Sequence, residues 1–294
     1  MVSKIGKISG HSGAIYDLEK RNNKVFSASA DGYVVQWDLT SFEQDGFAVK
    51  CSTPPYSVVS ANNHLWFGLS SGDLHIVDFS TKKEVKFYQQ HRSALFSLVE
   101  VPTTNFIVAG DAEGNLSIWN SKNLDLVLFL PLNCGKIRKI NAKSDGKLIV
   151  VHGQDEKIRI FETQYFNEIG TLPGHENGSC CSVFSALDEN KLISGGKDGL
   201  LKIWDWQAEK LLESIPAHNF AIYDLLLINE GKTIVSASRD KSIKIWDDLT
   251  YSFKQKLENK TGGHKHSVNS LCLVNENQFL STSDDRKIIK WQID

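Results

Sequence analysis

The feature of this sequence that most constrains its fold is a unit of about 42 residues that recurs seven times. Five of the seven tryptophans end a short alternating run, as in Tyr33 to Trp37 and Ser242 to Trp246. Alternation that ends in an aromatic residue is typical of a half-buried strand. Val77 and Phe161 occupy the same place in two further runs. The seven positions are Trp37, Val77, Trp119, Phe161, Trp204, Trp246 and Trp291.

Other residues recur at fixed places in the unit. An aspartate in a short turn precedes four of these aromatic residues by six positions, and a histidine lies 26 to 29 positions upstream of each tryptophan in the series. The aspartates are Asp31, Asp198, Asp240 and Asp285, and the histidines are His11, His91, His175, His218 and His264. Strands are expected over Ala14 to Leu18, over Lys24 to Ala28, over the aromatic run and over a fourth segment such as Lys210 to Ile215. Each unit therefore predicts one four-stranded antiparallel sheet.

A single four-stranded sheet would leave both faces in water, whereas seven sheets arranged radially bury their faces against one another. We therefore expect an all-β fold in which residues 1–294 form one domain of seven units. The units resemble those of the WD-repeat family of β-propellers, and three of them carry the Trp-Asp pair, at Trp37, Trp204 and Trp246. The resemblance implies a ring that one terminus closes. Residues 3–8 are expected to be the outer strand of blade 7.

The composition argues against two classes of partner. The chain has 33 basic and 35 acidic residues, a net charge of -2, and 41% hydrophobic residues. This balance disfavours binding to nucleic acid through phosphate neutralisation. No window approaches the roughly 18 apolar residues of a membrane span, and the first residues lack an apolar secretory core. The expected location is the cytoplasm, with the five scattered cysteines reduced.

Histidine, serine and aspartate recur together, which would suggest a nucleophilic triad if it happened once. An enzyme needs one triad, whereas this combination occurs four times, each followed by a tryptophan. The resemblance implies instead that each set is a structural hydrogen-bond chain from Asp through His and Ser to the Trp indole. The four sets are His11, Ser27, Asp31 and Trp37; His175, Ser194, Asp198 and Trp204; His218, Ser236, Asp240 and Trp246; and His264, Ser281, Asp285 and Trp291. We expect no catalytic residue, no metal site and no cofactor, because His64, His75, His152 and His266 are isolated.

The resemblance also implies a non-enzymatic platform that binds a peptide or protein around the narrow mouth of the central channel. The family's rim positions, carried onto this sequence, are Tyr16, Tyr56, Phe96, Arg138, Cys181, Tyr223 and Asn269. Basic neighbours are Lys136, Lys139, Lys197 and Arg239, and acidic neighbours are Asp17, Asp224 and Asp284. Aromatic residues and arginine are favoured anchors at interfaces. The predicted partner-binding residues are Tyr16, Tyr56, Phe96, Arg138, Tyr223, Arg239 and Lys197.

Three alternatives stay open at this point. The rim aromatics could pack inward across the channel. The protein could be a monomeric propeller that docks into a larger complex through its blade sides, where Trp66, Trp206, Tyr165 and Phe166 are expected to be exposed. It could also be a hydrolase, which would need unpaired carboxylates in the channel. Only Asp17 and Asp224 are expected near that place.

Overall fold

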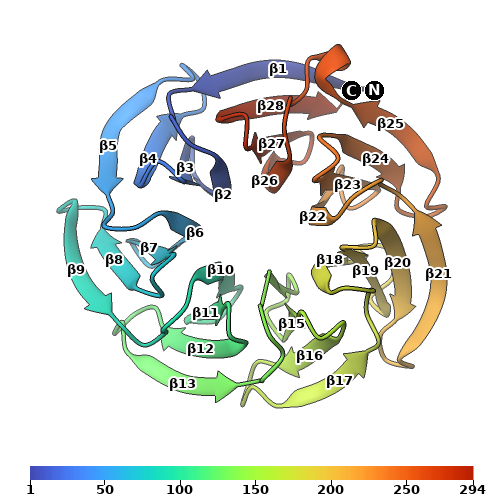
Figure 1. Ribbon diagram of the computed structural model, residues 1–294, viewed down its shortest axis with the longest axis horizontal. Helices are drawn as coiled ribbons and strands as arrows, with labels where there is room; N and C mark the ends of the chain where they lie inside the picture. The colour runs from blue at the N-terminus through green and yellow to red at the C-terminus, as the bar shows by residue number, and fades with distance from the viewer. Residues whose placement is uncertain (294) are drawn as a thin grey trace.

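The structure, a computed structural model that describes residues 1–293, consists of seven four-stranded antiparallel sheets arranged in a ring (Figure 1). The first strand of each blade faces the centre of the ring, and the fourth forms the circumference. The prediction of an all-β, seven-bladed propeller is confirmed. Asp294, the last residue of the predicted domain, lies outside the described residues.

The blades follow the chain order, with the seventh completed by the first strand. Blades 1 and 2 consist of β2 (Ile15–Arg21), β3 (Lys24–Ser29), β4 (Tyr33–Asp38), β5 (Gln44–Lys50), β6 (Pro55–Ala61), β7 (His64–Leu69), β8 (Leu74–Asp78) and β9 (Lys83–Tyr88). Blades 3 and 4 consist of β10 (Leu95–Val101), β11 (Phe106–Asp111), β12 (Asn115–Asn120), β13 (Leu126–Pro131), β14 (Ile140–Ala142), β15 (Leu148–His152), β16 (Ile158–Glu162) and β17 (Glu168–Leu172). Blades 5 and 6 consist of β18 (Ser179–Phe184), β19 (Lys191–Gly196), β20 (Leu200–Asp205), β21 (Lys210–Pro216), β22 (Ile222–Ile228), β23 (Thr233–Ser238), β24 (Ile243–Asp247) and β25 (Phe253–Leu257). The short helix η1 (Asn259–Thr261) leads into blade 7, which consists of β26 (Val268–Asn275), β27 (Gln278–Ser283), β28 (Lys287–Ile293) and β1 (Val2–Ser9).

The ring closes through the pairing of β1 with β28, in a register that runs from Val2 opposite Ile293 to Ser9 opposite Lys287. Val2 and Ile8 are buried, and the Val2 amide donates to Gln255 Oε1 at 2.7 Å. The prediction that the N-terminal strand completes the last blade is therefore confirmed, and this strand spans Val2–Ser9. It holds the first and last segments of the repeat together through a backbone ladder.

The hydrophobic core is divided into seven clusters, each of which fills the space between two neighbouring blades. The residue at the recurring aromatic position always packs against the preceding blade. Trp119 of blade 3, for example, packs with Trp66 and Ile76 of blade 2, and Phe161 of blade 4 packs with Ile118 of blade 3. Each blade consequently buries both faces, as a radial arrangement requires.

A second set of contacts joins the inner strands of neighbouring blades around the channel. Many of these contacts involve the residue that directly follows a predicted rim residue, because its side chain points towards the inner strand of a neighbouring blade. The hydrogen bonds are Val58 N to Asp17 Oδ2 (3.1 Å), Ser57 Oγ to the Leu95 carbonyl (2.9 Å), Ile140 N to Ser97 Oγ (2.9 Å), Ser182 N to Asn141 Oδ1 (3.1 Å), Leu271 N to Asp224 Oδ2 (2.8 Å) and Ser270 Oγ to Asp17 Oδ1 (3.1 Å). The channel mouth therefore rests on a rigid support.

Candidate functional site

The predicted rim residues occupy a common structural position, the bulge at the start of the innermost strand. In β2 the register passes from Ile15 to Asp17 and skips Tyr16. The same shift skips Tyr56, Phe96, Tyr223 and Asn269 in their strands. A β-bulge frees one residue from the ladder and redirects its side chain. These five side chains are thereby directed to the channel mouth, where all five line one cavity.

The bulge also corrects the expectation for blade 5. In β18 the shift lies between Ser179 and Cys181, so the residue equivalent to Tyr16 is Cys180 and not Cys181. Cys181 is paired opposite Gly195 and is fully buried, with its thiol 3.7 Å from the Ile222 carbonyl. Cys180 is buried as well, and burial raises the pKa of its thiol to about 11. Blade 5 thus contributes no exposed aromatic or charged group at this position.

Three aromatic rings form a continuous row across blades 1 to 3. The ring centroids of Tyr16 and Tyr56 are 4.7 Å apart in an edge-on arrangement, and those of Tyr56 and Phe96 are 5.0 Å apart with an interplanar angle of 18°. All three rings are half-buried. The rings pack partly on one another, and their remaining surface lines the cavity. Such contacts hold large apolar groups in place before any ligand arrives.

The segment that leads into β14 supplies the cations of blade 4. Ile137 is fully buried, and its amide donates to the Asp111 carbonyl at 2.9 Å. Its neighbours Lys136 and Arg138 are half-buried and lie at the mouth. The Lys136 Nζ lies 4.0 Å from the centroid of Phe96, and the Arg138 Cζ lies 4.3 Å from the centroid of Tyr223. Both cations are therefore stacked on rim aromatics.

The deepest cation of the segment, Lys139, is neutralised within the chain. Its Nζ forms an ion pair with Asp224 of blade 6. Burial acts against the charge of Lys139, but Asp224 and Asp17 nearby raise its pKa above the usual value. Burial raises the pKa of Asp17 to about 6, although Lys139 and the Val58 amide act in the opposite direction. Asp17 and Lys139 are half-buried and line the cavity, and the buried Asp224 lies behind them.

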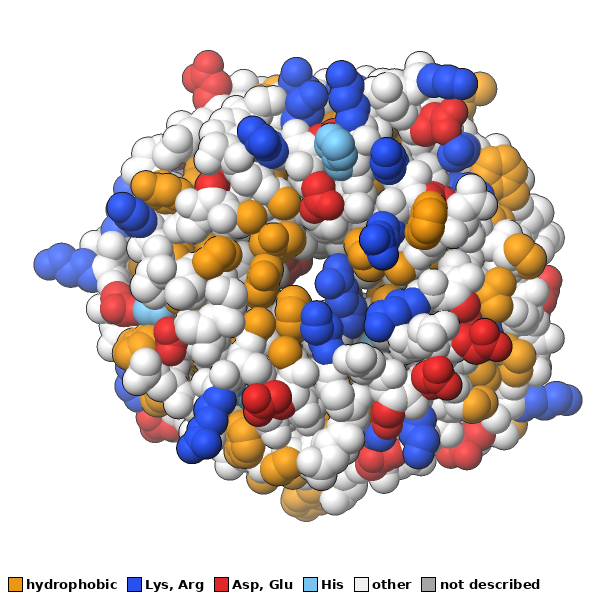
Figure 2. Space-filling view, viewed as in Figure 1, with side chains coloured by type: hydrophobic (Ala, Val, Ile, Leu, Met, Phe, Trp, Pro, Cys, Tyr) orange, Lys and Arg blue, Asp and Glu red, His pale blue; other side chains and the backbone are white. Residues whose placement is uncertain are grey.

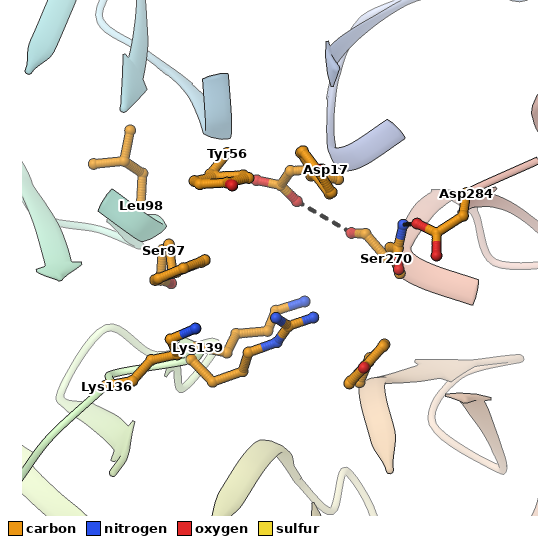
Figure 3. A pocket seen from close by; sticks show the side chains of 13 residues that line it. Asp17, Tyr56, Ser97, Leu98, Lys136, Lys139, Ser270 and Asp284 are labelled. Carbon is orange, nitrogen blue, oxygen red and sulfur yellow. Dashed lines mark hydrogen bonds between the residues drawn. The ribbon is translucent and has the colours of Figure 1, made fainter. Parts of the chain in front are cut away.

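Together these residues enclose a cavity of about 390 Å³. Figure 3 shows Lys136 and Lys139 on one side, Tyr56 and Asp17 on another, and Ser270 with Asp284 across from the cations. Seen from outside, basic side chains gather at the mouth beside apolar ones (Figure 2). The Asn269 amide group donates to Asp284 Oδ1 at 2.8 Å and fixes that exposed carboxylate. The cavity thus has an aromatic wall, a basic wall and an acidic edge.

The structure brings together five of the seven predicted partner-binding residues, namely Tyr16, Tyr56, Phe96, Arg138 and Tyr223. Lys197 and Arg239 are exposed and lie outside the cavity lining, with the Arg239 guanidinium 6.0 Å from the Phe220 ring. Asp224 was expected on the acidic side of the rim. This expectation is wrong, because Asp224 is buried and paired with Lys139.

The blade sides expose fewer aromatic residues than expected. Trp66 is fully buried between blades 2 and 3, and Phe166 is buried between blades 3 and 4. Trp206 is half-buried, and its indole donates to the Glu189 carbonyl at 2.9 Å. Only Tyr165 of these four residues is largely exposed, at 69%. The expectation of exposed Trp66 and Phe166 was wrong because both faces of a blade are covered by its neighbours.

The histidines lie at the centres of hydrogen-bond chains. His11 Nδ1 lies 2.8 Å from Asp31 Oδ2, its Nε2 lies 2.7 Å from Ser27 Oγ, and the Trp37 indole donates to the same Oγ at 2.7 Å. The sets around His175, His218 and His264 repeat this arrangement within 2.8–3.1 Å. Burial lowers the pKa of His11, His175 and His218 despite the aspartate beside each. Each of these three imidazoles is thus neutral at pH 7. A neutral ring donates from Nδ1 to Asp and accepts the serine hydroxyl at Nε2.

Blade 3 contains a fifth chain that the sequence pattern did not reveal. His91 Nδ1 lies 2.8 Å from Asp111 Oδ2, and its Nε2 lies 2.7 Å from Ser117 Oγ, which accepts the Trp119 indole N–H at 2.7 Å. The serine is on the tryptophan's own strand, whereas in the other sets it is on the preceding strand. The cross-strand partner of Ser117 is Ala109, at the position equivalent to Ser27. Ser117, directly opposite the position equivalent to Ser27, is the residue from which the hydrogen-bond chain of blade 3 could have been predicted.

The channel carboxylates are engaged by the chain itself. Asp17 accepts from the Val58 amide and from Ser270 Oγ, and Asp224 accepts from the Leu271 amide and pairs with Lys139. A hydrolytic site needs carboxylates that are free to exchange protons or to hold a metal. Over residues 1–293 no group of three or more potential ligands is placed to hold a metal ion. No helix in that range is long and apolar enough to cross a membrane.

Comparisons with known proteins identify a repeat family and several distant relatives. The model of the WD domain, G-beta repeat, matches more than half of the chain, at residues 2–38, 166–205, 209–247 and 255–292. Cilia- and flagella-associated protein 52 of Mus musculus is 22% identical over 84% of this chain and 42% of its own length. Pre-mRNA-processing factor 17 of Homo sapiens is 25% identical over 81% of this chain and 43% of its own length. Nuclear distribution protein nudF of Aspergillus niger is 23% identical over 58% of this chain. The chain spans less than half the length of these relatives.

Proposed function

This chain belongs to the WD-repeat family of β-propellers, and we propose that it is a non-enzymatic scaffold that binds a peptide or protein partner at the aromatic mouth of its channel. The observation that carries the proposal is the cavity of about 390 Å³ at the mouth, lined by Tyr16, Tyr56, Phe96, Arg138 and Tyr223. Fixed aromatic rings and a stacked arginine are the anchors that dominate binding energy at interfaces. Lys197 and Arg239 extend the proposed surface beyond the cavity.

The rigidity of the mouth supports binding to a folded or extended partner. Inter-blade hydrogen bonds hold the inner strands, and the rim rings pack on one another. A pre-organised surface loses little conformational entropy on binding. In this proposal the propeller is a monomer within a complex. We place it in the cytoplasm, where the five free thiols of residues 1–293 would stay reduced.

The second candidate is a structural subunit that docks through the blade sides. Tyr165, Leu211 and Leu212 favour it, because each exposes more than 40% of its surface on blades 4 and 5. A hydrolase has less support, because Asp17 and Asp224 are both hydrogen-bonded within the channel.

Quantitative affinity capture from native extract tests the two candidates against each other. The rim variant carries Tyr16→Ala, Phe96→Ala and Tyr223→Ala, and the matched side variant carries Tyr165→Ala, Leu211→Ala and Leu212→Ala. Both variants must melt like the wild type before they are compared. We expect a partner that the wild type and the side variant retain and that the rim variant loses by at least about 10-fold. Loss with the side variant alone would assign the binding to the blade sides.

A further inference from the structure

The clearest unexplained feature of the mouth is a difference among three cations of one short segment. Lys139 has an ion pair with Asp224. Lys136 and Arg138, which precede it and line the same cavity, have neither an ion pair nor a side-chain hydrogen bond to any residue of the range 1–293. Lys197 is unpaired within that range as well. The chain therefore neutralises the deep cation and leaves the cations at the mouth uncompensated.

The uncompensated charges lie close enough to repel one another. Burial lowers the pKa of Lys136, and the positive charges of Arg138 and Lys197 lower it further. Both Lys136 and Arg138 are half-buried, so water screens them less than it screens ordinary surface cations. A negative group placed between them would relieve this repulsion and gain two charge-assisted contacts.

The aromatic residues hold these cations in position. Lys136 lies over the Phe96 ring and Arg138 lies over the Tyr223 ring, at 4.0 Å and 4.3 Å. Stacking covers a face of the guanidinium and leaves its N–H groups at the edge, which is the geometry that binds an oxyanion with two parallel hydrogen bonds. Ile137 fixes the segment between them, because it is fully buried and its amide is bonded to blade 3.

We propose that the basic wall formed by Lys136 and Arg138 binds an acidic side chain of the partner, a carboxylate or a phosphate, while an adjacent apolar side chain of the same segment packs on Tyr16, Tyr56 and Phe96. This proposal rests on the proposed function. The proposal also gives the bound segment an orientation, because Asp284 lies across the cavity from Lys136 (Figure 3). The acidic side chain of the partner therefore lies against blade 4 and not against blade 7.

A protein segment suits the site better than a nucleic acid. The cavity offers two uncompensated cations beside a row of apolar rings, and the whole chain has a net charge of -2. Binding to nucleic acid relies on many basic residues that follow a strand of phosphates. A single acidic residue next to an apolar one matches the size and the charge of this site.

Selection from a displayed library of random peptides tests the proposal without knowledge of the natural partner. Four forms of the full chain are used: the wild type, the double variant Lys136→Gln/Arg138→Gln, the rim variant Tyr16→Ala/Phe96→Ala/Tyr223→Ala, and the control Lys83→Gln/Lys122→Gln. The control removes two exposed lysines, one at the start of the outer strand β9 and one in the turn between β12 and β13, and neither lines the cavity. We expect the wild type and the control to enrich peptides in which Asp or Glu stands beside an apolar residue. The double variant should lose the acidic preference and keep the apolar one, and the rim variant should enrich nothing.

Measurements on an enriched peptide then separate the sources of the anion. Fluorescence anisotropy compares the peptide with versions that carry Gln, Lys or phosphoserine at the acidic position. Replacement by Gln should weaken binding to the wild type at least about 10-fold and binding to the double variant less than about 3-fold. A tighter phosphoserine peptide would identify phosphate as the preferred group. Asp284→Asn should strengthen binding of the acidic peptide, because it removes a negative charge from the far wall.

The outcomes distinguish failure of this proposal from failure of the proposed function. Enrichment of apolar peptides without acidic residues would overturn the oxyanion site and leave the aromatic platform standing. An acidic preference that survives in the double variant would also overturn it. The absence of any peptide enriched by the wild type would contradict both proposals. A short single-stranded oligonucleotide that binds more tightly than the best peptide, in an Arg138-dependent way, would refute the assignment to a protein partner.

Discussion

Ser117 of blade 3 offers a direct test of whether the recurring hydrogen-bond chains stabilise this fold. Its hydroxyl lies fully buried, 2.7 Å from the imidazole of His91, and accepts the indole N–H of Trp119 at 2.7 Å. Ser117→Ala removes both hydrogen bonds and creates almost no cavity. The two buried groups then lose their partner in a place that water does not reach.

The expected loss follows from the two orphaned groups. Each buried donor or acceptor without a partner costs about 1–3 kcal/mol, so Ser117→Ala should lower the free energy of unfolding by roughly 2–6 kcal/mol. Urea unfolding followed by tryptophan fluorescence and by circular dichroism measures this change, provided that the two probes give coincident transitions. Ser3→Ala, which changes an exposed serine of β1, is the matched control.

The register of blade 3 provides a rescue. Ala109 lies directly opposite Ser117 and occupies the position at which Ser27 forms the chain in blade 1. The double change Ser117→Ala/Ala109→Ser moves one oxygen across the strand pair and should recover most of the lost stability. A Ser117→Ala protein that unfolds at the same urea concentration as Ser3→Ala would refute the reasoning. So would a rescue variant that is no more stable than Ser117→Ala alone.

Three other perturbations have defined outcomes. Deletion of residues 1–9 removes the outer strand of blade 7 and should lower the melting temperature sharply, and a truncated chain that melts like the full one would contradict ring closure through β1. His152 is fully buried, and burial lowers its pKa to about 3. Below about pH 6.5 the unfolded chain therefore binds a proton at His152 that the folded protein does not bind. Stability should fall by up to about 1.4 kcal/mol per pH unit between pH 6.5 and 3 because of His152, and His152→Gln should show a shallower decline in urea titrations at several pH values. Lys139→Met leaves Asp224 buried without its cation and should cost about 3 kcal/mol, part of which Lys139→Met/Asp224→Asn should recover in the same assay.

The architecture could be predicted from the sequence because each repeat contains an alternating run that indicates one of its strands. Seven alternating runs at a near-constant period located the third strand of every blade, including the runs in which Val77 and Phe161 replace tryptophan. The place of residues 3–8 before His11 predicted closure of the ring, since it matches the place of β21 before His218. These signals are local in sequence, so spacing alone was sufficient to read them.

The errors arose where position depends on hydrogen-bond register or on neighbouring blades. The expectation of Cys181 assumed a one-residue insertion in blade 5, but the bulge is at Cys180, five residues after His175 as in the other blades that carry this histidine. The prediction that Trp66 is exposed assumed that one face of β7 is in contact with water. In the structure Leu65 packs towards blade 1 and Trp66 towards blade 3. No alternation of polar and apolar residues distinguishes the faces of a strand that is covered on both sides.

Blade 4 departs furthest from the repeat, and it supplies the basic wall of the candidate site. It lacks the histidine and the tryptophan, and its inner strand β14 has only three residues. The segment before β14 is held by Ile137 and by two backbone hydrogen bonds between residues 138–139 and His152. In this irregular segment Lys136 lies over the Phe96 ring of blade 3 and Arg138 lies over the Tyr223 ring of blade 6. In a fold whose repeats are fixed by buried hydrogen-bond chains and by packing between blades, such a departure is where side chains are released from structural roles. The uncompensated charge of Lys136 and Arg138 is therefore better explained by a ligand than by the stability of the ring.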